Sequence, residues 1–125
     1  MNAKYSAYPT ISLDSKVIAF DAGIRWHVIP LDIMQKHPII YDKLMDKTNK
    51  EVDVSITRCP YTSTIVIYEG KMKLGDTENN NIILKKNGSN IQQLTGECSK
   101  KNGNCFVRRW EAYVMTLSNV LHELT

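Results

Sequence analysis

Residues 81–91 read NIILKKNGSNI, two short apolar runs separated by the pair Asn87-Gly88. An Asn-Gly pair between such runs is the strongest short-range signal for a β-hairpin, because both central positions of its tight turn need a positive φ. We therefore expect an antiparallel hairpin with this pair at its tip and with Leu84 opposite Ile91.

Short strands separated by turns are predicted along most of the chain. Val17–Phe20 and Ile24–Ile29 predict a hairpin closed over Gly23, and Thr62–Glu69 is rich in β-branched residues. Val52–Ile56 alternates apolar and polar residues, which predicts a half-buried strand with Asp53 and Ser55 on its second face. Residues 1–10 suggest an arm or a first short strand, residues 79–81 a loop, and residues 101–103 a second turn.

Two helices are expected. Pro30 suits a first helical turn, and the helix that it starts should stop or restart at Pro38. Residues 42–50 (DKLMDKTNK) then read as a helix end and a loop. Near the C-terminus, apolar residues recur at helical spacing, but 106–114 can also be a strand followed by a shorter helix capped by Ser118. We favour the strand and the shorter helix.

These elements predict a single α+β domain over residues 1–125, β-dominant, with about seven strands mostly in hairpins and two helices. The length of 125 residues leaves room for one domain. No run of alternating βαβ units is visible, which argues against a doubly wound parallel sheet.

Composition narrows the function classes. The formal charge is +3, with 16 Lys and Arg against 13 Asp and Glu, which is too small to indicate nucleic-acid binding by itself. No signal peptide or membrane-spanning run is visible, so we expect a cytoplasmic protein without a membrane partner. Lys outnumbers Arg by 12 to 4 and Asn and Ile are abundant, a usage typical of an AT-rich microbial or viral genome.

Several stretches in register resemble an uncharacterised domain family found mainly in bacteria and archaea. That family has the pattern Y-P-L-x-I-L-x-W-H-E, then C-P-L-x-G-T, then Q-x-T-G-E. The matching runs here are Ile29–Met34 with His37, Cys59–Thr64, and Gln93 with Thr95–Glu97. The resemblance is colinear over about Asp14 to Glu97 and implies a fold and a set of site candidates, but no reaction.

This chain departs from the family pattern at several positions. Lys36 and Pro38 replace the Trp and Glu that flank the family's histidine, and Ser63 replaces the Gly of the Cys-Pro motif. The family often has C-x-x-C where this chain has Thr62, so a two-cysteine redox motif is absent.

The catalytic candidates are Cys59, His37 and Glu97. A reactive cysteine needs access and a lowered pKa, and a histidine with carboxylates can serve acid–base chemistry. With His27 or Asp42 these residues could instead form a zinc cluster, although no standard ligand spacing frames them. We expect no metal and no cofactor, and Cys59 also reads as a small buried hydrophobe at a strand end.

The binding candidates are polar and basic residues near predicted turns: Gln93, Thr95, Lys85, Lys86, Lys100 and Lys101. Arg108 and Arg109 form a third basic pair. Nucleic-acid contact would need these pairs on one face with interleaved aromatics. Cys98 and Cys105 could lie opposite each other on a hairpin and form a disulfide, whereas reduced thiols are the default in a chain without a signal peptide.

The preferred hypothesis is a non-enzymatic binding or protein-interaction module that binds a protein partner or associates with itself. A small enzyme or metal protein using Cys59 and His37 is the first alternative. Weak nucleic-acid binding through the basic turns is the second.

Overall fold

Short strands joined by turns produce three antiparallel sheets. The computed structural model describes residues 12–22, 25–78, 81–98 and 107–124. They form, in order, β1 (Lys16–Ala22), β2 (Arg25–Pro30), α1 (Leu31–Lys36), β3 (Ile39–Met45), β4 (Glu51–Arg58), β5 (Ile65–Glu69), β6 (Lys73–Glu78), β7 (Asn81–Lys86), β8 (Ser89–Gln92), β9 (Arg109–Glu111), β10 (Tyr113–Thr116) and α2 (Leu117–Leu124).

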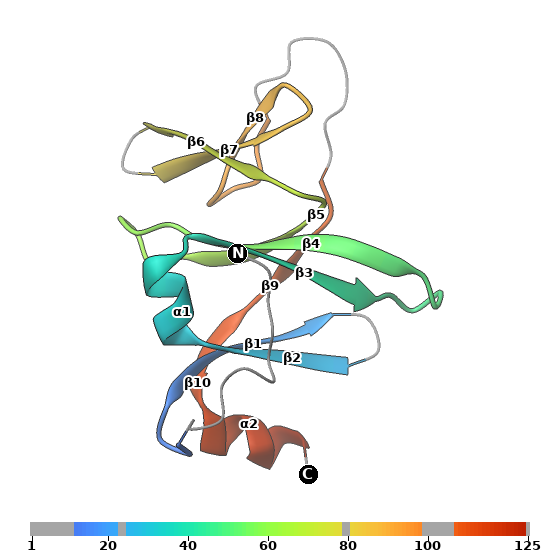
Figure 1. Cartoon of the computed structure of the whole chain (residues 1–125), viewed down its shortest axis with the longest axis vertical. Coiled ribbons are helices and arrows are strands. Elements are labelled where there is room, and N and C mark those ends of the chain that lie inside the picture. Colours follow the sequence, from blue (N-terminus) through green and yellow to red (C-terminus); the bar gives the residue numbers. More distant parts are fainter. Residues whose placement is uncertain (1–11, 23–24, 79–80, 99–106, 125) are drawn as a thin grey trace.

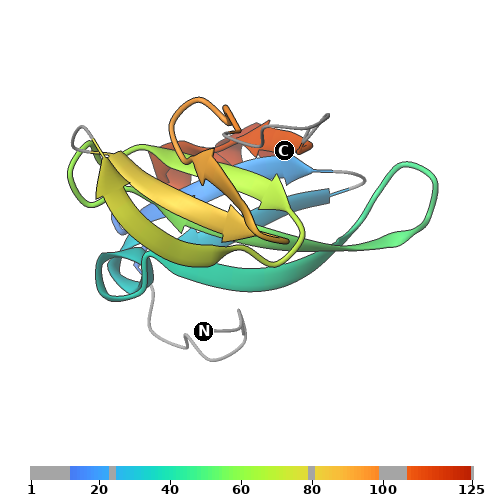
Figure 2. The ribbon, with the colours of Figure 1, turned by 90° about the horizontal axis from the view of Figure 1, so that it is seen from above.

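The sheets lie in layers. Sheet 1 has the strand order β10-β1-β2, sheet 2 has β3-β4-β5-β9, and sheet 3 has β6-β7-β8. Figure 1 shows α2 below sheet 1, sheet 2 in the middle and sheet 3 at the top, with α1 beside sheets 1 and 2. Seen from above, the layers lie over one another and the β3–β4 turn projects beyond them (Figure 2).

Each interface between layers has its own apolar core. The core between sheets 1 and 2 includes Phe20, Ile29, Ile56 and Ile67, together with Met34 of α1. The core between sheets 2 and 3 contains Ile39, Cys59, Tyr68, Met72, Ile82, Leu84 and Ile91. Val120 of α2 covers Val17 and Ala19 on the outer face of sheet 1. Burial of apolar area at three interfaces therefore holds the layers together.

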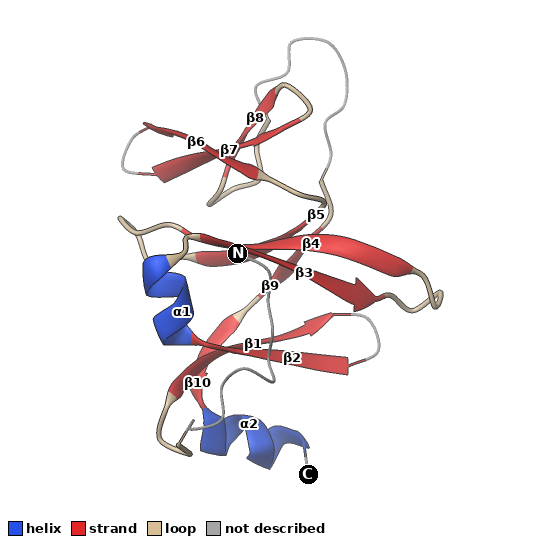
Figure 3. Ribbon diagram, viewed as in Figure 1, coloured by secondary structure: helices blue, strands red, loops and turns tan. Residues whose placement is uncertain are grey.

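One extended segment joins the first two sheets. Its first half, β9, pairs with β5, so that Trp110 lies opposite Ile67. After Ala112, its second half, β10, pairs with β1, so that Val114 lies opposite Ile18. Figure 3 shows this segment as β9 and β10, running from the middle sheet down to α2. The segment ties the two sheets at one side.

The predicted hairpins are confirmed where the structure describes them. Asn87 and Gly88 have φ angles of 51° and 79° and lie at the β7–β8 turn, where Leu84 pairs with Ile91. β1 and β2 form the predicted N-terminal hairpin. α1 ends at Lys36, two residues before Pro38, as that proline predicts.

The prediction for residues 42–50 was half right: the helix end was wrong, because residues up to Met45 belong to strand β3 (Ile39–Met45), whereas 46–50 form the predicted loop before β4. The apolar residues Ile40 and Leu44 of β3 are buried against sheet 1, and the strand pairs with β4 over its whole length. Pairing and burial therefore outweigh the polar local composition. Strand β6 was also missed, since its polar sequence KLGDTE becomes a strand by pairing with β7.

The preferred C-terminal interpretation is confirmed, with one correction. Strands β9 and β10 precede a short helix, α2. The helix is capped by Thr116 and not by Ser118, because the Thr116 hydroxyl oxygen accepts a hydrogen bond from Asn119 N at 3.2 Å. Ser118 lies inside the first turn and its backbone N donates to Leu13 O.

The fold is β-dominant with two helices, as predicted, but the described residues form ten strands and not about seven. The two helices are short, so the α+β description fits only loosely. Neither of them has the length and apolar character needed to cross a membrane. The expected N-terminal arm or strand (1–10), the turn at 101–103, and residues Lys100, Lys101 and Cys105 lie outside the described residues.

Candidate functional site

Cys59 lies in the interior, at the end of β4, with a fully buried side chain. The turn after it is closed by Cys59 N, which donates to Thr64 O at 3.0 Å, and by Ser63 N, which donates to Cys59 O at 2.7 Å. Burial raises the pKa of the Cys59 thiol, but hydrogen bonds from the Thr62 hydroxyl and from the backbone of Thr62, Ile82 and Tyr61 outweigh it and leave the pKa lowered. The pKa of the Cys59 thiol thus lies below its ordinary value, while the sulfur has no access to solvent.

His37 and Glu97 are exposed on different parts of the fold. His37 follows α1, and Pro38 O accepts from Arg58 N at 2.9 Å, so the chain at His37 runs beside the end of β4. Extending the β3–β4 register places His37 across from Cys59. The backbones are therefore adjacent, but one side chain is exposed and the other enclosed. Glu97 lies after β8, in the top layer.

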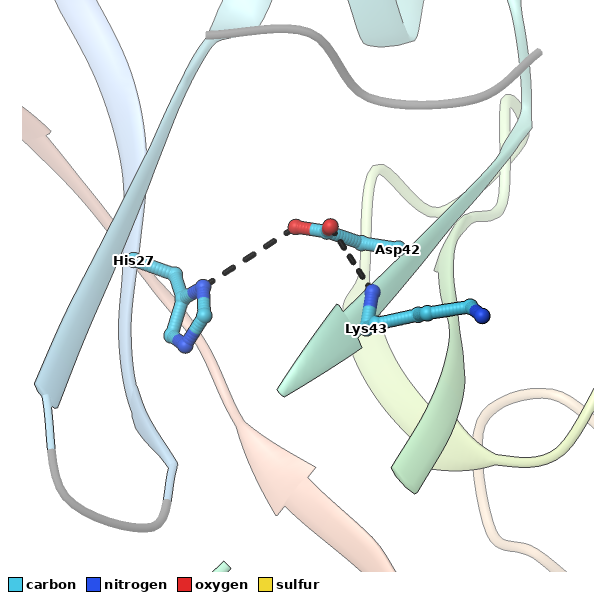
Figure 4. A network of polar contacts seen from close by, with 3 residues as sticks. All are labelled: His27, Asp42 and Lys43. Carbon is cyan, nitrogen blue, oxygen red and sulfur yellow. Dashed lines mark hydrogen bonds and ion pairs between the residues drawn. The ribbon is translucent and has the colours of Figure 1, made fainter. Parts of the chain in front are cut away.

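His27 and Asp42 meet between sheets 1 and 2 (Figure 4). His27 Nδ1 lies 3.9 Å from Asp42 Oδ2, and the His27 ring stacks on Phe20 with 5.0 Å between centroids. Asp42 Oδ1 also accepts from Lys43 N at 2.8 Å. This contact links β2 to β3. Within the described ranges, no group of three or more His, Cys, Asp or Glu side chains lies close enough to hold a metal ion.

Gln93 is fully buried and its amide is used inside the protein. Its Nε2 donates to Thr64 O at 3.0 Å and to the Thr57 hydroxyl at 3.2 Å. Its Oε1 accepts from the Thr64 hydroxyl at 2.9 Å. Gln93 therefore connects the segment after β8 to sheet 2 and leaves no surface for a ligand.

Thr95 and Glu97 form the turn that follows. Gly96, with a φ of 77°, stands between them, and its N donates to Gln92 O at 2.8 Å. The Thr95 hydroxyl oxygen accepts from Glu97 N at 3.2 Å. These contacts describe a structural turn, with Glu97 exposed at its end.

The basic candidates that the structure describes are engaged by their neighbours, with one exception. Lys86 Nζ donates to Glu69 O at 3.2 Å, and Arg109 donates to Leu94 O at 3.3 Å. Arg108 stacks over Trp110, 4.5 Å from the ring centroid. Lys85 is exposed on β7. In the described part of the chain, the aromatic contact of these basic residues is that of Arg108 with Trp110, and it involves no lysine.

Cys98 is disulfide-bonded, whereas Cys59 is a reduced thiol. The sequence analysis considered a disulfide between Cys98 and Cys105, and Cys105 lies outside the described residues.

Strand β10 presents backbone groups that point away from its neighbour. Leu117 N donates to Ser15 O at 3.0 Å, one step beyond the pair Lys16–Thr116. Hydrogen-bonded and non-hydrogen-bonded pairs alternate along an antiparallel ladder. The backbone groups of Tyr113 and Met115 therefore face β1, while those of Val114 face the opposite edge.

The edge of β10 at Val114 is open because strand β5, which pairs with β9, does not extend as far as Val114. Glu69 N donates to Arg108 O at 2.9 Å, so Arg108 and Glu69 form a hydrogen-bonded pair. Because such pairs alternate along the ladder, the backbone groups of Trp110, and of every second residue after it, also point toward the β5 side. Strand β5 begins at Ile65, level with Ala112. Since the preceding segment is the turn after Cys59, Val114 lies beyond the end of β5, and in the described structure β10 pairs with β1 alone.

The other edge strands carry features that hinder pairing. β3 and β9 bear charged side chains, β2 ends in a proline, and β6 has charges and an irregular register. The outer side of β8 is occupied by a bridge between Ile91 and Cys98. Such features protect natural edges against association. Among the edges that the structure describes, only β10 (YVMT) has no charge, no proline, no bulge and no covering bridge.

Exposed apolar side chains surround this edge. Tyr113 is 52% exposed and Val114 50%. Leu121 of α2 is also exposed, as is Leu13, whose carbonyl accepts from the first turn of α2. Among the residues that the structure describes, seven large hydrophobic side chains are exposed, and these four of them lie on or beside β10 and α2. We call Leu13, Tyr113, Val114 and Leu121 the β10–α2 surface.

The sequence interpretation missed this surface and the buried polar contacts. Ser55, Thr57 and Tyr68 are fully buried and hydrogen-bonded between sheets 2 and 3. The signal available for the first two was the absence of charge on the second face of β4 beyond Asp53. No local pattern in the sequence indicated that the edge of β10 would be open.

No protein-family model matches the chain, and no curated protein or solved structure matches it either. The resemblance drawn from the sequence motifs stays a prediction.

Proposed function

We propose that this chain is a non-enzymatic protein-interaction module that binds its partner along strand β10. The observation that carries the proposal is the uncharged, unpaired edge at Val114, flanked by the exposed side chains of the β10–α2 surface. Added strands bind such edges through main-chain hydrogen bonds, and neighbouring side chains supply selectivity.

The polar candidates favour this function over catalysis. Cys59 is enclosed, Gln93 is committed to internal hydrogen bonds, and His37 and Glu97 are exposed on separate parts of the fold. Catalysis by a nucleophile and a base needs the two side chains within hydrogen-bond reach of each other and open to substrate. The exposed apolar side chains gather elsewhere, at β10 and α2, where a partner gains by covering them.

The experiment uses random peptides displayed on phage and selected against the wild-type chain. Enriched peptides are then synthesised and titrated against wild type, Val114→Lys and Leu74→Lys. Leu74 is a matched control, since it is 51% exposed and also lies on an edge strand, β6.

A lysine at position 114 can keep its stem on the sheet and its charge in water, so the fold should survive while the edge is blocked. We expect the Kd to rise at least about tenfold for Val114→Lys and to stay unchanged for Leu74→Lys. Equal binding by Val114→Lys, or no enrichment at all, would contradict the proposal.

A further inference from the structure

Two lysines face each other across sheet 3. Lys73 of β6 is directly paired with Lys85 of β7, and Lys85 is paired on its other side with Asn90 of β8. Leu84 and Ile91, their neighbours along the strands, pack toward sheet 2. Because successive side chains of a strand alternate between its two faces, the row of lysines points to the opposite, outer face. All three polar residues are exposed there, on the top layer of the fold (Figure 1).

The Lys73–Lys85 pair is unfavourable to the fold by itself. Like charges directly opposite each other on two strands are destabilising. Elsewhere in the fold a strand lysine has a carboxylate beside it, since Lys43 Nζ lies 3.1 Å from Glu51 Oε1. Among the residues that the structure describes, no carboxylate forms an ion pair with Lys73 or Lys85. The fold therefore holds two uncompensated positive charges next to each other.

Protection of a sheet edge explains one of these lysines and not the other. β6 is an edge strand of sheet 3, and a lysine on an edge strand discourages pairing with another chain. β7 is the central strand, paired with β6 on one side and with β8 on the other. A lysine on a central strand protects no edge, so Lys85 requires a different explanation.

Gly75 makes room for the Lys85 side chain on β6. A Cβ added at Gly75 would lie 3.2 Å from Lys85 Cε and 3.3 Å from Lys85 Cγ. The lysine stem therefore runs over the space that a side chain at position 75 would fill. Gly75 also lies in the register irregularity between Leu74 and Thr77, and such bulges redirect side chains near functional sites. Lys85 is thus directed across β6, the strand that carries Lys73.

We propose that the Lys73–Lys85 pair binds the phosphoryl group of a small anion, either free phosphate or a phosphate ester. The two ammonium groups supply hydrogen-bond donors for its oxygens, and a dianion between them replaces their repulsion by attraction. A nucleic-acid strand suits this face less well, because β6, β7 and β8 contain no aromatic residue on which bases could stack. The site belongs to sheet 3 and does not rest on the function proposed for β10.

The first test is a titration of the full chain with sodium phosphate, followed by amide NMR shifts, with chloride used to keep the ionic strength low and constant. We expect the amide signals of Lys73, Gly75 and Lys85 to move with a Kd of about 1 mM. Lys85→Gln should raise this Kd at least about fivefold, the effect of one unit charge at contact distance in water. Lys47→Gln, in the β3–β4 turn, is the matched control and should leave it unchanged. Equal Kd values for wild type and Lys85→Gln overturn the inference.

The second test measures the repulsion between the two lysines. At low ionic strength without phosphate, Lys73→Gln and Lys85→Gln should each raise the urea midpoint of unfolding. The double variant should gain less than the sum of the two, because either substitution alone removes the repulsion. Phosphate should raise the midpoint of wild type more than that of the double variant, and Lys47→Gln controls for the lower net charge. Additive changes, or an equal effect of phosphate on both proteins, overturn the inference.

A third titration, with AMP, separates the two sources of the phosphoryl group. Tighter binding of AMP than of inorganic phosphate assigns a phosphate ester, and equal or weaker binding assigns the free anion. Either result supports the site when Lys85→Gln weakens the binding. Tighter binding of a short single-stranded DNA than of AMP would assign an extended strand to this face and overturn the choice of a small anion.

Discussion

Gln93 and Thr64 hydrogen-bond to each other in both directions: Gln93 Nε2 donates to Thr64 O, and the Thr64 hydroxyl donates to Gln93 Oε1. The two residues are 29 positions apart in sequence. This reciprocal pair fixes the segment after β8 to the start of β5. Thr57 supplies a third partner from β4, so one amide connects three segments.

Replacement of Gln93 should therefore be costly. Gln93→Ala removes a buried side chain and leaves buried groups of Thr57 and Thr64 without their partner, which we expect to cost about 2–4 kcal/mol of unfolding free energy. Urea denaturation followed by circular dichroism measures the change. The neighbouring Gln92→Ala is the matched control, because Gln92 is only partly buried and should cost less than about 1 kcal/mol. Equal costs would show that the Gln93 contacts contribute nothing particular.

Tyr68 should make stability depend on alkaline pH. Burial raises the pKa of the Tyr68 phenol, an effect that Arg109 partly offsets, and the hydroxyl donates to Gln93 O at 2.7 Å. Because the pKa is higher in the folded than in the unfolded chain, its contribution to stability is complete below about pH 10, the ordinary tyrosine pKa, and is lost as the pH rises above it.

The measurement is unfolding free energy from pH 8 upward for wild type and Tyr68→Phe. Tyr68→Phe should be less stable by about 1 kcal/mol near neutral pH, through the lost hydrogen bond. The unfolding free energy of Tyr68→Phe should also decline less steeply than that of wild type above about pH 10. Tyr61→Phe is the control, since Tyr61 is exposed and should change neither value. Parallel pH curves for wild type and Tyr68→Phe would contradict the assignment.

The sequence predicted elements whose signal is local. Asn87-Gly88 alone specifies the β7–β8 turn, and Pro30 and Pro38 bound α1 through their own backbone restrictions. Strands β3 and β6 were missed because their polar residues become strand through pairing with the next strand along the chain, β4 and β7, and not through a local preference of their own. Local composition does not indicate which strands will pair, because strand preference depends on the neighbouring strands.

Burial of the second face of β4 was equally nonlocal. Alternation correctly put Ser55 on the face opposite Val54, but that face is covered by sheet 3, and Ser55 binds Gly70 O and Met72 N there. The open edge at Val114 depends on where β5 begins, in a segment about 50 residues earlier in the chain. A single sequence cannot fix such a relation, because it results from the stacking of sheets.

The cap of α2 can be tested by a pair of substitutions. The Thr116 hydroxyl accepts from Asn119 N, whereas Ser118 is exposed in the first turn. Thr116→Ala should lower the unfolding free energy by about 1 kcal/mol, the usual cost of losing a cap. Ser118→Ala should change it by less than about 0.5 kcal/mol. A larger effect at Ser118 in urea titrations would restore the cap that the sequence pattern indicated.

Cys59 combines a thiol pKa below the ordinary value with complete burial, and the two properties predict different reactivities. The thiolate fraction favours fast reaction, but a labelling reagent must reach the sulfur. Because the side chain has no exposed surface, access requires local or global opening of the layers, and opening governs the rate. We expect native Cys59 to react with a maleimide or disulfide reagent at least about 100-fold more slowly than a free model thiol, the effect of an opening cost near 2.7 kcal/mol. The labelling rate should rise with urea below the unfolding midpoint.

Cys59→Ser should lower the unfolding free energy by about 1 kcal/mol, and Cys59→Ala gives the comparison without a polar group. Labelling faster than the model thiol at neutral pH would show an accessible thiolate, and would move the site of function from β10 to the turn after β4.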